Sequence, residues 1–162
     1  MKITEGLSIE VRGLPNSQVG PNSRNFYKKK NSYFQKEKND FYDLLIMSGH
    51  QLDPLWQHVA VHFTFHAADR RRRDIDNLIA CAKPWIDAMQ GVLIPGDDSR
   101  HLQQLSASYY NCEGKESYTE VAVTNLDAKV SELDVRDIDE LKDILENDHH
   151  QRRGKRLLDG IG

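Results

Sequence analysis

The chain has no long apolar run. None of its 162 residues lies in an apolar stretch near the ~18 residues that a membrane-spanning helix needs, so no membrane span is expected. The first residues, MKITEGLSIEV, carry acids and no apolar core, unlike a secretory signal. Cysteine is scarce too. Cys81 and Cys112 have no metal-ligand spacing and are expected to be reduced thiols of a cytosolic protein. A length of 162 residues is most simply that of a protein with one main domain.

The chain also has little net charge, but its charges are unevenly distributed. The formal net charge is −3. Residues 1–126 contain 15 basic and 15 acidic side chains, whereas residues 127–162 contain 7 basic and 10 acidic ones and supply the whole excess. We therefore expect residues 1–126 to form the folded domain and 127–162 an acidic extension, partly helical or disordered. The bases of the domain are clustered, and a local basic patch can bind a polyanion whatever the total charge.

Hydrophobic periodicity predicts a mixture of strands and helices. Alternation and β-branched residues predict strands at about residues 7–12, 55–67, 102–110 and 118–124. Apolar residues at helical spacing predict helices at about residues 33–47 and 76–90, ended by Gly49 and Gly91. Asp76 or Asn77 is the expected N-cap of the second helix, which Pro84 should kink or split.

The segment ADRRRRDIDN places two carboxylates, Asp74 and Asp76, directly after four arginines. In an extended segment both would leave one face, with Cα atoms roughly 6–7 Å apart. A third carboxylate from the later turn PGDDS, Asp97 or Asp98, would increase their repulsion. Protonation, pairing with arginine or a bound divalent cation such as Mg²⁺ would each relieve it. Taken alone, PGDDS fits a plain turn, and the arginines fit a solvated edge.

Two further groups of residues allow both a functional and a structural interpretation. Lys83 falls on one helical stripe with Asp76 and Asp87, so it could stabilise charge on a phosphate or simply pair with Asp87 at i, i+4. Three histidines recur at every fourth position, at His58, His62 and His66. On a strand, neighbours four residues apart are separated by about 13 Å, too far to share one ion, so a half-exposed strand face is the expected interpretation.

The runs RRRRDIDN, KPWIDAM and GVLIPGDDS together resemble the RusA-type Holliday junction resolvases of bacteria and their phages. The segment GLPNSQVGPNSR, followed by a basic helix, resembles the opening of phage members. The resemblance covers about residues 7–124 and is most specific around 70–99. With the elements above, it implies a RusA-like α+β domain over residues 1–126, in which a small mixed sheet packs with two main helices, plus a short C-terminal helical tail.

The resemblance also implies an activity and its residues. It implies a Mg²⁺-dependent (or Mn²⁺-dependent) endonuclease that resolves Holliday junctions by paired nicks in recombination and repair, acting as a homodimer in the bacterial cytoplasm without a small-molecule cofactor. Asp74, Asp76 and Asp98 match the metal-binding aspartates, while Asp97 would shape the turn. Lys83 matches the catalytic lysine of some members; others have it four residues after the second aspartate, where this chain has Ala80. Phosphate contacts are expected from Arg70, Arg71, Arg72, Arg73, Lys28, Lys29 and Lys30.

Two alternatives stay open at this point. One is a non-catalytic protein that binds junctions or duplex DNA through the same basic surface. The other is a nuclease that acts mainly on flaps and other branched DNA.

Overall fold

The described part of the chain is built on a four-stranded mixed β-sheet. The computed structural model describes residues 5–127, which belong to one compact unit. The strands are β1 (Gly6–Arg12), β2 (Val59–Ala67), β3 (Leu102–Asn111) and β4 (Tyr118–Asn125), in the spatial order β1-β4-β2-β3. β2 and β3 run parallel, while both pairings of β4 are antiparallel. β1 and β3 are therefore the two edges of the sheet.

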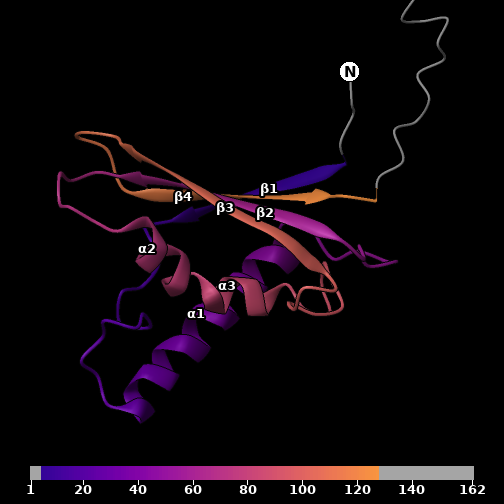
Figure 1. The fold of residues 1–162 in the computed structure, drawn as a ribbon, viewed down its shortest axis with the longest axis horizontal. Coiled ribbons are helices and arrows are strands. Elements are labelled where there is room, and N and C mark those ends of the chain that lie inside the picture. The colour runs from indigo at the N-terminus through magenta and orange to yellow at the C-terminus, as the bar shows by residue number, and fades with distance from the viewer. Residues whose placement is uncertain (1–4, 128–162) are drawn as a thin grey trace, which may run out of the picture. The chain divides into compact units, whose positions relative to one another are not determined.

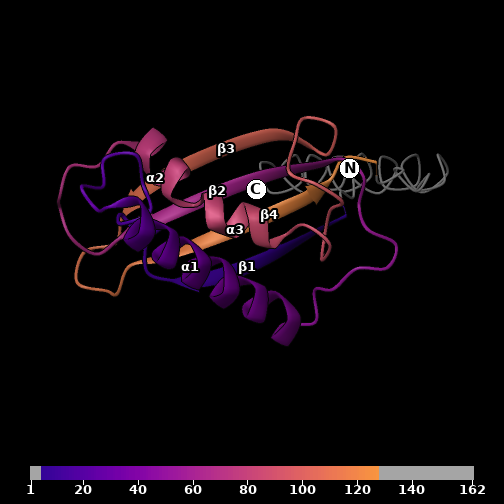
Figure 2. The same cartoon turned by 90° about the horizontal axis from the view of Figure 1, so that it is seen from below.

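Three helices cover one face of this sheet, as Figures 1 and 2 show. They are α1 (Tyr27–Met47), α2 (Ile75–Cys81) and α3 (Lys83–Ala88). α1 packs against α3, and α2 contacts β3. Within residues 5–127 no helix has the length and apolar character required to cross a membrane.

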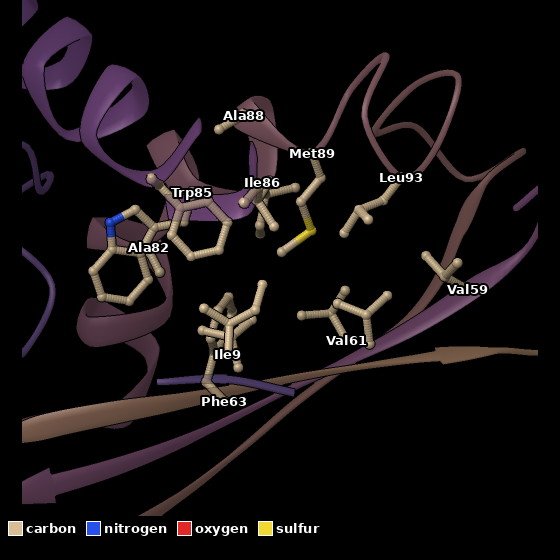
Figure 3. Packing of buried hydrophobic residues seen from close by; sticks show 14 of the residues in the cluster. Ile9, Val59, Val61, Phe63, Ala82, Trp85, Ile86, Ala88, Met89 and Leu93 are labelled. Carbon is tan, nitrogen blue, oxygen red and sulfur yellow. The ribbon is translucent and has the colours of Figure 1, made fainter. Parts of the chain in front are cut away.

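The core lies between the helices and this sheet face. Along β2 every second side chain from Val59 to Ala67 is buried, because alternate residues of a strand point to the same face. Trp85 of α3 stacks on Phe41 of α1, with ring centroids 5.8 Å apart, and Figure 3 shows it above the sheet with Ile86 and Met89. Burial of these large side chains fixes α1 and α3 on the sheet.

The α+β fold predicted from the sequence is confirmed, and so are its four strands. α1 begins six residues earlier than predicted, so it includes the three lysines at its start. Pro84 does split the second helix, since its missing N–H and its ring favour the start of a new helix at this position. The tail helix predicted near Asp137 lies outside the described residues.

The predicted start of the second helix was wrong. The N-cap is Asp74, with extended φ and ψ of −90° and 127°, and Ile75 is already helical. Asp76 therefore lies inside the first turn of α2, and its carboxylate accepts a bond from the N–H of Asn77 at 2.9 Å. Because the chain is already helical at Asp76, Asp74 and Asp76 do not lie on one face of an extended segment.

The histidines behave as the strand interpretation predicted. His62 and His66 lie on the face of β2 that points away from the helices, and His58 precedes the strand. Their polar partners differ: His58 with Asp127, His62 with Ser106 and His66 with Glu120. The three rings therefore serve separate local contacts.

Candidate functional site

The four arginines lie in the loop between β2 and α2, and they differ in their partners. Arg70 donates to Glu113 at 2.8 Å, and Arg71 lies 3.8 Å from Asp69. Arg72 has no acidic partner within the described residues. These three side chains are exposed, so they form a solvent-facing basic segment.

Arg73 is different because its side chain turns inward. Only 21% of it is exposed, and it donates two bonds to Asp69, at 2.6 and 2.9 Å, and one to the hydroxyl of Tyr109. The Arg73 guanidinium and the Arg71 N–H hold the pKa of Asp69 at about 2, and Asp69 in turn raises the pKa of Arg73. Arg73 thus fastens this loop to β3, whereas the side chains of the other three arginines stay exposed to solvent.

Asp74 and Asp76 have no cationic partner among residues 5–127, although four arginines directly precede them. Both side chains are exposed at the start of α2. Their position in the first turn is favourable for a carboxylate, since the helix dipole is positive there. The local arginines therefore leave these two carboxylates free to meet a cation from outside the chain.

Lys83 lies at the break between α2 and α3 and contacts two carboxylates. Its ammonium is 2.7 Å from Oδ1 of Asp87, and it also donates to Oδ2 of Asp97. The Asp87 oxygen is buried and, despite this short approach, has no partner in good hydrogen-bond geometry. Partial burial lowers the pKa of Lys83, but the two carboxylates outweigh this and raise it, while Lys83 lowers the pKa of Asp97. The i, i+4 pair with Asp87, one of the two interpretations of Lys83, is therefore present.

The two adjacent acids of the turn, Asp97 and Asp98, have different partners. Asp98 closes the turn: it accepts bonds from the backbone N–H of Arg100 at 2.9 Å and from its guanidinium at 2.6 Å. The guanidinium and that N–H lower the pKa of Asp98 to about 2. Asp97 points instead to Lys83. Asp97, expected to shape the turn, is thus the member of the pair that contacts Lys83.

A pocket of about 310 Å³ joins the arginine segment to the loop after β1. Its lining includes Arg72, Asp74 and Asn77 on one side and Pro15 on the other. Asn22 of this loop donates to Asn77 at 3.3 Å. The sequence motif GLPNSQVGPNSR and the RRRRDIDN motif therefore meet in space, although about 50 residues separate them in the chain.

The loop requires glycine where it approaches α2. Gly20 is buried, and a Cβ atom added to it would lie 2.5 Å from the sulfur of Cys81. Burial raises the pKa of that thiol, and both cysteines are free. The close approach fixes the loop against the helix that begins with Asp74.

Lys28, Lys29 and Lys30 occupy the first turn of α1, where they oppose the helix dipole. No acidic residue lies in this turn, and no side chain caps it. Basic residues at a helix N-terminus are destabilising by about 0.3–1 kcal/mol each when exposed. Helix stability therefore does not explain the lysines, which fit an anionic ligand.

The donors expected to hold a metal fit a hard cation in their chemistry, since carboxylate oxygens are the ligands that Mg²⁺ prefers. Their positions fit less well. Within residues 5–127 no three His, Cys, Asp or Glu side chains are arranged to hold an ion. Asp74 and Asp76 are available, whereas Asp98 is bound to Arg100. For all three aspartates to bind one metal ion, Asp98 would have to release Arg100.

The comparisons with known proteins add no family. A scan against models of protein families found no match, and a search among curated proteins found none either. The site therefore depends on the residues described above.

Sequence reasoning missed the contact of Asp97 with Lys83, by which Asp97 and Asp87 both pair with the same ammonium group. The i, i+4 spacing predicted the Asp87 contact, but Asp97 is 14 residues from Lys83. The contact arises because the buried residues Val92 to Ile94 fold the chain back against α3. No local pattern in the sequence indicates this reversal.

Proposed function

We propose that the chain is a divalent-metal-dependent endonuclease that resolves four-way DNA junctions by paired nicks. The observation that carries the proposal is that, within residues 5–127, Asp74 and Asp76 have no cationic partner although four arginines precede them. Arginines that merely balanced these carboxylates would contact them. Here they contact other acids or solvent, which leaves a basic segment next to two free carboxylates.

The residues would divide the work by charge. Arg70, Arg71 and Arg72 are exposed and would hold backbone phosphates, a task in which lysines 28–30 would share. Arg73 would act indirectly, by fixing the loop through Asp69. Lys83 would stabilise the negative charge that develops on the attacked phosphate, and Asp87 and Asp97 would keep it protonated and in position.

Asp74 and Asp76, with Asp98 once Arg100 releases it, would hold Mg²⁺ or Mn²⁺. Such an ion would polarise the phosphodiester and make water a stronger nucleophile. The carboxylates would hold the ion and, in its absence, would repel the phosphate backbone.

The proposal includes a homodimer, because paired nicks require two sites. We assign its interface to the β3 edge. This ten-residue strand, LQQLSASYYN, contains no charged residue and is mostly exposed on its free side, whereas the β1 edge carries Glu10 and Arg12. Uncharged exposed edges are the ones that pair with another strand. Antiparallel pairing of two β3 strands would extend the sheet and keep both sets of helices on one face.

The decisive experiment replaces Asp76 with Asn and measures nicking and binding separately. Nicking of a synthetic four-way junction in Mg²⁺ should be abolished, while junction binding should be kept or tightened because a negative charge facing phosphate is removed. Asp40→Asn, an exposed carboxylate on α1, is the matched control and should nick normally. A wild-type protein that binds junctions in Mg²⁺ but never nicks them would refute the enzymatic proposal.

A second candidate is a non-catalytic junction-binding protein. Two contacts favour it: Lys83 is already neutralised by two aspartates, and Asp98 is bound to Arg100. Cleavage of junction, flap and linear duplex at matched salt separates all three possibilities. Preferential cleavage of flaps would keep the chemistry and change the substrate, and no cleavage of any would favour the binding protein.

A further inference from the structure

The segment from residue 13 to residue 36 has no acidic side chain. It contains five basic ones: Arg24, Lys28, Lys29, Lys30 and Lys36. The nearest acids in the chain are Glu10 and Glu37. In a chain that is acidic overall, this concentration of positive charge predicts a polyanionic partner for the segment.

Two aromatic side chains stand exposed in the middle of this basic segment. Phe26 is 89% exposed and Tyr27 83%, at the N-cap and first position of α1. The core keeps its other phenylalanines at least partly covered, with Phe41, Phe63 and Phe65 each at most 2% exposed. Full burial of a side chain of this size would stabilise the fold by about 1.5–3 kcal/mol, which the exposed pair does not contribute. Neither core packing nor helix capping therefore accounts for their position.

The exposed pair lies at the end of the described domain where α2 begins. In Figures 1 and 2 the first turn of α1 is at the same end of the molecule as α2, and Figure 1 shows it on the side away from the sheet. The loop before it is tied to α2 by the bond between Asn22 and Asn77. A nucleic acid held over Asp74 and Asp76 would therefore extend towards Phe26 and Tyr27.

We propose that Phe26 and Tyr27 form a stacking site for nucleobases that are unpaired at a DNA branch point, with lysines 28–30 holding the adjoining phosphates. This inference rests on the proposed function and names the feature of the substrate that the protein recognises. Aromatic rings stack on the flat face of any base, but in a linear duplex these faces are covered by neighbouring bases. Only a branch point, an end or a single strand offers them. The aromatic pair would thus select branched DNA, whereas the lysines and arginines bind phosphates in any DNA.

The test measures binding of the full chain to a synthetic four-way junction and to a linear duplex of equal length, in Ca²⁺ to suppress cleavage. The double substitution Phe26→Ala, Tyr27→Ala should weaken junction binding by about tenfold or more, because two stacking contacts are lost. Duplex binding should change by less than about twofold and the salt dependence on the junction should be unchanged, since the phosphate contacts remain. Replacement of both residues by Trp should restore junction affinity.

Tyr42→Ala is the matched control, because Tyr42 is an exposed aromatic further along α1, at 44% exposure. Its junction affinity should equal that of the wild type. A junction with 2-aminopurine at the branch point gives a second readout: its fluorescence should change on binding the wild type and Tyr42→Ala, and much less on binding the double variant.

The possible failures are distinguishable. If wild type nicks junctions and the double variant binds junction and duplex as wild type does, the stacking site is wrong and the nuclease stands. The same conclusion follows if the double variant loses affinity for junction and duplex equally. It also follows if, in a parallel assay with anionic lipid vesicles, the double variant loses vesicle binding but keeps junction binding. If the affinity and fluorescence results are as expected but the wild type does not nick DNA, the stacking site stands and the catalytic proposal fails. If wild type binds no DNA, both fail.

Discussion

At the scale of single residues, neighbours of the same type have different roles. Arg72 and Arg73 are adjacent, yet one is exposed without an acidic partner among residues 5–127 and the other is bound to Asp69 and Tyr109. The same division separates Asp97, which contacts Lys83, from Asp98, which closes a turn. Sequence alone assigns all four arginines to the phosphate backbone, because nothing local distinguishes them.

Substitutions at Arg72 and Arg73 should therefore have different effects. Arg72→Ala should remove one phosphate contact, so the slope of log binding constant against log salt concentration should become less steep by about 0.9. The free energy of unfolding should be unchanged. Arg73→Ala should lower the free energy of unfolding, because it leaves the Asp69 carboxylate without its bidentate partner. Junction binding at several salt concentrations and urea unfolding provide the two measurements. Equal loss of stability in both variants would contradict the assigned roles.

The same ion pair predicts a dependence of stability on pH. Arg73 holds the pKa of Asp69 at about 2, below its value of about 3.9 in an unfolded chain. The pair's contribution is therefore fully present above pH ~4 and is lost as the pH falls towards ~2. Asp69→Asn should lower the urea midpoint at pH 7, and this difference from wild type should shrink between pH ~4 and ~2.

Asp40→Asn serves as the control for that titration, because Asp40 forms only an exposed i, i+4 pair with Lys36. Its midpoint should follow that of the wild type closely at every pH. A difference between Asp69→Asn and wild type that stays constant down to pH 2 would show that Asp69 does not stabilise the fold through its charge.

At the scale of elements, close packing between the loop after β1 and α2 positions the candidate site. Gly20→Ala should lower the free energy of unfolding by about 1–3 kcal/mol, since the new methyl group would lie 2.5 Å from the Cys81 sulfur. In a Cys81→Ala background the same change should cost clearly less, because the obstructing atom is absent. Urea unfolding of the four proteins of this cycle measures the coupling, and additive effects would exclude the contact.

The elements were also the level that the sequence predicted best. β2 has a regular period of two, and Leu78, Ala82, Trp85 and Met89, which follow one another at helical spacing, are all buried. The start of α2 was missed because Asp74, Asp76 and Asn77 are all good N-caps, and only the path of the chain selects among them. The Lys83–Asp97 contact was missed because it depends on a chain reversal that has no periodicity.

At the scale of the whole molecule, the free edge of the sheet predicts the assembly. Sedimentation of the full chain should show a dimer, and Ser106→Lys on β3 should convert it to a monomer because two like charges would meet across the strand pair. Ser8→Lys, the matched change on the exposed side of β1, should remain a dimer. A monomeric wild type, or a dimeric Ser106→Lys variant, would rule out this interface.

The stacked pair Phe41 and Trp85 has a consequence for how the molecule would measure its substrate. α1 carries lysines 28–30 at its start, α3 carries Lys83 at its start, and the ring contact in the core joins the two helices. In the proposed enzyme, packing in the core would therefore fix the distance between the phosphates bound at the start of α1 and the phosphate cut beside Lys83. The spacing between branch point and nick would then depend on core residues that do not touch DNA.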